Sequence, residues 1–183
     1  MTMEFEPYLL MANGTICPAP SVPLNEWNQA ADRQKRPGSW GKWRRKGKTL
    51  NIRWNNGKTS TWKYGEVYSA KPGTPGFKLT GRYRTIGGGG NSALGGDVTV
   101  FYQKAYVFAP DGTFTSDSTG GGFSSSSTAS SSRQGRGRYR IDGWTITLTA
   151  PDGSTQRGLF YRFPDSDNAI GILGSTYSKE RSR

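Results

Sequence analysis

The sequence predicts an all-β protein, an antiparallel meander of short strands that either closes into a barrel or folds as two packed sheets. Two features of the composition favour this fold class. The chain contains 26 glycines, and aromatic residues make up 13% of it although its hydrophobic content is only 32%. Few but large apolar side chains, combined with many glycines, are typical of strands and tight turns rather than helices. The third observation is an internal repeat.

The repeat relates residues 41–59 to residues 137–155. Each copy reads as strand, turn, strand and turn, and the two copies align without a gap. The aromatic Trp43 corresponds to Tyr139, and a partial third copy begins at Gly81. The identical positions are Gly41, Arg44, Gly47, Thr49, Gly57 and Thr59 in the first copy and Gly137, Arg140, Gly143, Thr145, Gly153 and Thr155 in the second. We therefore expect similar hairpins in both halves of the chain.

Turn and helix patterns place the remaining elements. Asn13-Gly14 predicts a type I′ turn, with positive φ at both central residues, between strands at 6–11 and 15–17. One short helix is expected at 24–35, because Leu24, Trp27 and Ala31 share a face at helical spacing and Pro37-Gly38 follows. Two loops are predicted, one from the glycines at 87–90 and 95–96 and a mobile one at 118–134. The second is rich in Gly, Ser and Thr and cannot bury enough surface to order itself.

The Pro/Gly-rich segment 71–76 predicts a division of the chain. An N-terminal region, residues 1–75, would hold the helix and the first repeat copy. A second β region would span residues 76–183. One continuous domain over residues 6–178 is the alternative.

From Gly81 onward the order of motifs resembles a known fold family. The run comprises Gly-Arg-Tyr-Arg at 81–84, Tyr-Val-Phe-Ala-Pro-Asp-Gly-Thr-Phe at 106–114, Gly-Arg-Tyr-Arg-Ile-Asp-Gly at 137–143 and Thr-Ile-Thr-Leu-Thr-Ala-Pro-Asp-Gly at 145–153. It is similar to the small lipocalin-like (calycin-type) β-barrel domains of uncharacterised bacterial proteins, over residues 76–175. The resemblance implies an antiparallel barrel, with an interior cavity for a small apolar ligand.

The charge of the chain points to an anionic partner. The formal net charge is +12 and the sequence pI is about 10.0. A nucleic acid, an anionic polysaccharide or a lipid headgroup surface would match this charge, and solubility alone is the alternative. The candidate polyanion-binding residues are Lys42, Arg44, Arg45, Lys46, Arg53 and Lys63.

The same stretch also contains tryptophans. Successive side chains of a strand alternate between its faces. Alternation predicts that Trp43, Trp54 and Trp62 lie on the apolar face and that the cations lie on the solvent face. Base stacking on these rings would need rings and cations on one surface. Core packing is therefore the expected role of the rings.

The residue inventory argues against an enzyme. The chain has no histidine, which excludes His-liganded zinc sites, Ser-His-Asp triads and Cys-His dyads. Cys17 is the one cysteine and is expected to be a buried structural thiol, so no internal disulfide is possible. The carboxylates considered for acid–base chemistry are Glu66, Asp97, Asp165 and Asp167, and paired carboxylates catalyse glycoside hydrolysis only when they are held across a cleft. No catalytic residue, metal or cofactor is predicted.

Three functional hypotheses follow. The first is a non-enzymatic binding domain whose ligand or partner meets the barrel mouth or the basic outer face. The second is a nucleic-acid or polyanion-binding module that uses strands within 42–63. The third is an extracellular structural subunit, a homo-oligomer that pairs through the N-terminal strand or an edge at Val98–Phe108. The sequence has no apolar run of the ~20 residues that a membrane helix needs and no signal-peptide pattern, and it leaves export and the cytoplasm equally open.

Overall fold

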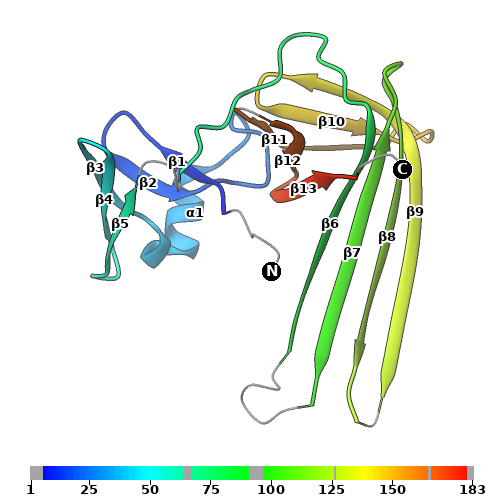
Figure 1. Ribbon diagram of the computed structural model, residues 1–183, viewed down its shortest axis with the longest axis horizontal. Helices are drawn as coiled ribbons and strands as arrows, with labels where there is room; N and C mark the ends of the chain where they lie inside the picture. Colours follow the sequence, from blue (N-terminus) through cyan, green and yellow to red (C-terminus); the bar gives the residue numbers. More distant parts are fainter. Residues whose placement is uncertain (1–5, 64–66, 91–96, 126, 165, 181–183) are drawn as a thin grey trace.

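The computed structural model describes residues 6–63, 67–90, 97–125, 127–164 and 166–180. It contains a closed eight-stranded barrel, a separate five-stranded sheet and one short α-helix (Figure 1). Every strand pair in both sheets is antiparallel. The prediction of an all-β antiparallel meander with a barrel and one helix is therefore confirmed.

The N-terminal sheet is formed by five strands in sequential order. They are β1 (Tyr8–Leu10), β2 (Thr15–Pro18), β3 (Gly41–Lys46), β4 (Thr49–Trp54) and β5 (Thr59–Lys63). Helix α1 (Gln29–Lys35) and a 3₁₀ turn, η1 (Pro37–Ser39), connect β2 to β3. This sheet carries the basic stretch that the sequence singled out.

The barrel follows as an up-and-down meander. Its strands are β6 (Gly81–Gly90), β7 (Thr99–Phe108), β8 (Thr113–Phe123), β9 (Thr128–Asp142), β10 (Thr145–Thr149), β11 (Thr155–Phe163), β12 (Ser166–Ile172) and β13 (Ser175–Lys179). Each strand pairs with the next, and β13 returns to β6 through Ser178 opposite Arg84 and Lys179 opposite Tyr83. That return closes the barrel.

The segment between the two sheets is held against the barrel. Lys71 forms an isolated bridge with Arg162, and Gly73 forms one with Gly143. A Cβ on Gly73 would collide with Ile141 of the core, so the close approach requires glycine. The Leu159 amide also donates to the carbonyl of Ser21 at 2.9 Å, which adds a contact to the chain before the helix.

Four hairpins share one turn, and each turn contains an Asn-Gly or Asp-Gly pair, at 13–14, 56–57, 111–112 and 152–153. In Met11–Thr15, the amide of the first residue donates to the carbonyl of the fifth at 2.8 Å, and Gly14 donates to Met11 at 2.9 Å. The same bonds close the turns at 54–58, 109–113 and 150–154. Gly14 has φ 77°, but Asn13 does not have positive φ; Leu173 is the one non-glycine residue that does among those described. The type I′ prediction is therefore wrong. The geometry is that of a type I turn followed by a glycine bulge.

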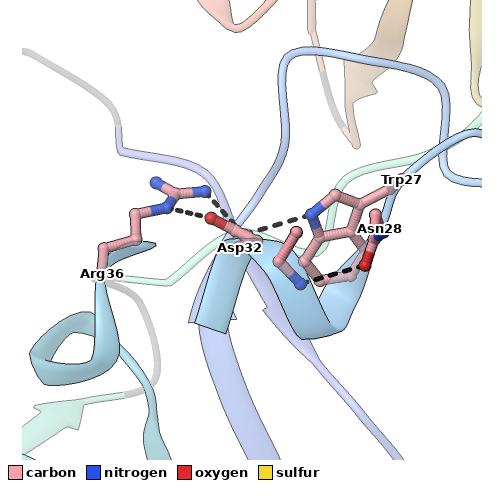
Figure 2. Close-up of polar contacts among 5 residues, drawn as sticks. Trp27, Asn28, Asp32 and Arg36 are labelled. Carbon is pink, nitrogen blue, oxygen red and sulfur yellow. Dashed lines mark hydrogen bonds and ion pairs between the residues drawn. The ribbon is translucent and has the colours of Figure 1, made fainter. Parts of the chain in front are cut away.

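The helix begins later than predicted. Asn28 caps α1 by accepting a hydrogen bond from the Ala31 amide at 3.0 Å (Figure 2). Residues 24–28 therefore lie outside the helix, contrary to the predicted start at residue 24. Trp27 instead donates to Asp32 at 3.1 Å, and its ring stacks on Trp40 at 5.8 Å.

Both predicted glycine- and serine-rich loops are largely strands. Gly87–Gly90 belong to β6, and most of residues 118–134 belong to β8 and β9; Gly95 and Gly96 lie outside the described residues. Figure 1 shows β6–β9 continuing past the barrel as a four-stranded extension. We call this extension the ribbon; it comprises residues 85–90, 99–104, 118–123 and 128–133.

Aromatic side chains explain why a glycine-rich segment forms a sheet. Tyr102 lies opposite Gly87 on one side and Gly120 on the other. A Cβ on Gly87 would collide with the Tyr102 ring, and one on Gly121 would lie 3.1 Å from the Phe101 ring. The rings therefore cover the flat surface that glycine leaves, as cross-strand aromatic–glycine pairs do in other sheets. The loop prediction assumed that only burial in a core could order this segment, whereas here aromatic side chains of the neighbouring strand cover the glycines.

Candidate functional site

The N-terminal sheet has one aromatic face. Trp43 lies opposite Ile52, and Leu50 lies opposite Trp62, so these side chains point to the same side. The ring of Tyr8 reaches across from β1 and packs 5.0 Å from the Trp62 ring. The indole of Trp43 donates to the Met11 carbonyl at 3.2 Å. This arrangement agrees with the strand alternation predicted for the tryptophans.

The opposite side of the sheet is the cationic face. It carries five of the six candidate residues: Lys42, Arg44, Lys46, Arg53 and Lys63. All five are exposed. Lys42 lies directly opposite Arg53, while Lys46 and Lys63 both lie opposite Thr49. The structure thus brings cations from three strands onto one face of the sheet.

Arg45 is the exception among the candidate residues. It lies opposite Leu50 and therefore shares the aromatic face. Its Nε donates to the Gly47 carbonyl at 3.1 Å. Side chains alternate along β3, so Arg45 points to the side opposite Lys42, Arg44 and Lys46 and belongs to a different surface from the other five candidates.

The electrostatics of the cationic face differ from those of the barrel. Among the described residues, none of Lys42, Arg44, Lys46 and Arg53 forms an ion pair; Lys42 Nζ donates to the Thr15 hydroxyl at 3.1 Å. On the barrel, by contrast, Arg82 lies 2.9 Å from Asp117. Like charges directly opposite on neighbouring strands are destabilising. The pair of Lys42 and Arg53 therefore has a cost that no carboxylate in the described ranges offsets by an ion pair.

A large groove separates the aromatic face from the outside of the barrel. Its volume is about 1120 Å³. Tyr8, Trp54 and Trp62 line it from the N-terminal sheet, and Trp144 and Tyr161 line it from the barrel. Arg45, Lys48 and Lys63 also contribute to its wall. No sequence pattern predicts this groove, because it depends on how two sheets lie against each other.

The inside of the barrel is filled with side chains. Phe108, Phe160, Ile146 and Ile172 are fully buried there. Side chains of the core thus occupy the interior in which the lipocalin resemblance implied a ligand cavity. A second pocket, of about 630 Å³, is lined by Phe114, Arg136, Arg138 and the turn after β10.

Of the four carboxylates considered for acid–base chemistry, the structure describes Asp97 and Asp167, and these two lie on different parts of the barrel sheet. Asp97 accepts hydrogen bonds from the amide and hydroxyl of Ser125 at the ribbon tip, which lowers the pKa of its carboxyl. Asp167 lies 3.7 Å from Arg162 on the barrel. Glu66 and Asp165 lie outside the described residues. In the described part of the chain, no three His, Cys, Asp or Glu side chains gather into a potential metal site.

Cys17 is fully buried on β2. Burial is the main reason why the pKa of its thiol is raised to about 11, with a smaller contribution from the charge of Asp32. A thiol with so little thiolate is a poor nucleophile. Its position agrees with the expected structural role.

No helix in the described part of the chain is long and apolar enough to cross a membrane. The chain matches no protein-family model, no curated protein and no solved structure.

Proposed function

We propose that the chain is a non-enzymatic binding protein whose N-terminal sheet holds the phosphate backbone of a nucleic acid on the cationic face. The observation that carries the proposal is the direct cross-strand pairing of Lys42 with Arg53 on an exposed surface. A fold gains nothing from two opposed cations, whereas a bound phosphate would relieve their repulsion.

The geometry of the face suits a linear polyanion. Alternate residues of a strand are about 6.6 Å apart. Lys42, Arg44 and Lys46 therefore form a row of charges about 13 Å long on β3. Arg53 widens this row on β4. Because the rings of Trp43, Trp54 and Trp62 point to the other side, binding would depend on charge and be nearly independent of base sequence.

Salt dependence tests this mechanism. Each cation that neutralises a phosphate of a single strand contributes about −0.7 to the slope of log affinity against log salt. Four contacts predict a slope of about −3 and a loss of affinity of roughly 50-fold between 50 and 200 mM salt. The measurement is fluorescence anisotropy of labelled oligonucleotides at a series of salt concentrations.

A matched pair of variants separates this face from the overall charge. Arg44→Ser/Arg53→Ser should move the slope toward zero by about 1.4. Arg138→Ser/Arg140→Ser removes the same charge from exposed positions of the barrel and should leave the slope nearly unchanged. Equal losses in both variants would refute a specific face. Binding to heparin but to no oligonucleotide would refute the nucleic-acid class.

We infer that the barrel is lipocalin-like in its fold. Support comes from the sequential antiparallel order of its eight strands and their closure through β13 and β6. Since the core fills the interior, a small-molecule role for this protein belongs to the groove outside the barrel.

The groove supports a second candidate function, the binding of a small anionic ligand with an aromatic ring. The specific observation is that rings from both sheets and the cations Arg45 and Lys48 line one space. Anilinonaphthalene sulfonate, which has both chemical features, is a suitable probe. Trp62→Ala should weaken its fluorescence enhancement, whereas Phe123→Ala, at an exposed ring of the ribbon, should not. The reverse pattern would place the dye on the ribbon and contradict this candidate.

A further inference from the structure

The ribbon has two unpaired edges. On β6, the partner strand β13 reaches only Tyr83 and Arg84. On β9, the pairing with β10 starts only at Arg138, which lies opposite Thr149. Among the described residues, 85–90 of β6 and 128–137 of β9 therefore pair on one side only. The unpaired segment of β6 and residues 128–133 of β9 lie on the part of the sheet that extends past the barrel (Figure 1). The predicted edge at Val98–Phe108 is wrong, because β7 lies between β6 and β8.

The hydrogen-bond pattern shows which backbone groups are unpaired. The Ser124 amide donates to Ser127, and the Tyr139 amide donates to Gly112, so odd-numbered residues of β9 face β8. The even-numbered ones, including Ser130 and Ser132, direct their N–H and C=O groups outward. On β6 the Glu180 amide donates to the Arg82 carbonyl, so even-numbered residues face outward there as well. Ile86 is one of them.

These edges lack the usual protection against pairing. Natural sheets shield an edge with proline, a bulge or closely spaced charges. Neither unpaired segment contains proline, and the register between β8 and β9 is continuous. The unpaired part of β6 has no charged residue, and that of β9 has only Arg133 and Arg136.

The ribbon also lacks a buried face of its own. Val100 and Tyr102 point to one side, and each is 50% exposed. Ile86 and Phe123 point to the other side, with exposures of 56% and 50%. A sheet normally needs one hydrophobic face packed on something for independent stability. Additional strands at its edges would supply both backbone hydrogen bonds and cover for these side chains.

We propose that the free edge of β6 pairs with the free edge of β9 of a second copy of this chain, in a head-to-tail assembly. β6 runs from the barrel toward the ribbon tip, and β9 runs from the tip back to the barrel. Copies placed side by side with their tips aligned therefore bring these edges together in the antiparallel orientation. Because the ribbon consists of the four antiparallel strands β6–β9, its two edge strands run in opposite directions, and the next copy can continue the sheet.

Charge and edge count favour this arrangement over a two-fold dimer. A symmetric pairing of β9 with its own copy at full overlap would place the two Arg133 side chains directly or diagonally across from each other, which is unfavourable. It would also leave both β6 edges unpaired. Head-to-tail pairing satisfies both edges of every inner copy, and because each copy retains a free edge, it grows beyond a dimer.

Blocked-edge variants test the proposal. Ile86→Pro removes an outward amide from β6, and Ser132→Pro removes one from β9; neither amide serves the ribbon itself. Ile86→Val and Ser132→Ala keep the amides and serve as matched controls. Light scattering coupled to size-exclusion chromatography gives the number of copies, and circular dichroism verifies that each variant is folded.

The mixing experiment distinguishes the possible interfaces. Wild type and both controls should form species larger than a dimer. Each proline variant alone should be a monomer, because it retains only one of the two complementary edges. An equimolar mixture of the two should yield a dimer with one copy of each. A monomeric wild type at its highest soluble concentration, or self-association of Ile86→Pro alone, would overturn the proposal. This outcome is independent of oligonucleotide binding by the N-terminal sheet.

Discussion

Tyr139 connects three backbone groups beside the turn between β7 and β8, and its replacement by phenylalanine offers a sharp test of the core. The Leu79 amide donates to the Tyr139 hydroxyl at 2.8 Å. The hydroxyl lies 3.0 Å from each of the carbonyl oxygens of Leu79 and Ala109, and its single proton is shared between these two acceptors. The ring is buried and packs edge-on against Phe108, with centroids 4.8 Å apart. Tyr139→Phe keeps the ring and removes only the hydroxyl.

The expected cost follows from the groups left without a partner. A buried donor that loses its acceptor costs about 1–3 kcal/mol, so we expect the free energy of unfolding to fall by about 2 kcal/mol. For a chain of this length the melting temperature should fall by about 4–8 °C. Urea and thermal unfolding followed by circular dichroism measure both quantities.

Tyr177→Phe is the matched control for this prediction. Tyr177 is buried in the barrel core as well, with 2% exposure against 4% for Tyr139, but its hydroxyl forms no hydrogen bond within the described part of the chain. Its loss should change the unfolding free energy by less than about 0.5 kcal/mol. If both variants lose the same stability, the hydrogen bonds of Tyr139 do not fix this end of the barrel.

Three further predictions concern packing and titration. Gly137→Ala should strongly lower the melting temperature, because its Cβ would collide with the Thr149 carbonyl, whereas Gly89→Ala should be tolerated because its Cβ meets nothing within 4 Å. Cys17 should react with a thiol reagent orders of magnitude more slowly in the folded than in the urea-unfolded protein, because burial raises the pKa of its thiol to about 11; equal rates would contradict this. Paired hydrogen bonds from the Arg36 guanidinium (Figure 2) lower the pKa of the Asp32 carboxyl. The stabilising contribution of the Asp32 carboxylate is therefore complete above the ordinary aspartate pKa and is lost as the pH falls through the lowered pKa of the folded state. In Asp32→Asn this group no longer titrates, so the melting temperature should fall less steeply with pH in the acid range.

Local patterns predicted the parts of this fold that depend on neighbours in sequence. Asx-Gly pairs marked the hairpins correctly because the glycine of each turn has positive φ, as Gly57 does with 84°. The turn type at Asn13 was wrong because the sequence shows where a positive φ is required but not how many residues share it. Alternation placed Trp43 and Arg44 on opposite faces of β3, as the register shows.

Features that depend on distant contacts could not be predicted in this way. The ribbon is ordered by rings of β7 lying over glycines of β6 and β8, which requires the register between three strands. The groove depends on Trp62 and Trp144, which come from different sheets. The predicted helix start was wrong because the Asn28 side chain accepts the hydrogen bond of the Ala31 amide and so begins the helix there. The apolar spacing of Leu24 and Trp27 does not show where such a cap lies.

The two repeat copies give a final test of why the cationic face is charged. Both have the same register, with Trp43 opposite Ile52 in one and Tyr139 opposite Leu148 in the other. Arg53 of the first copy corresponds to Thr149 of the second, so this strand pattern is compatible with an uncharged side chain at that position. Arg53→Thr should therefore leave stability unchanged or raise it by about 0.2–1 kcal/mol, since it removes the repulsion with Lys42. The same variant should weaken oligonucleotide binding at low salt. A loss of stability with unchanged binding would show instead that Arg53 serves the sheet and not a polyanion.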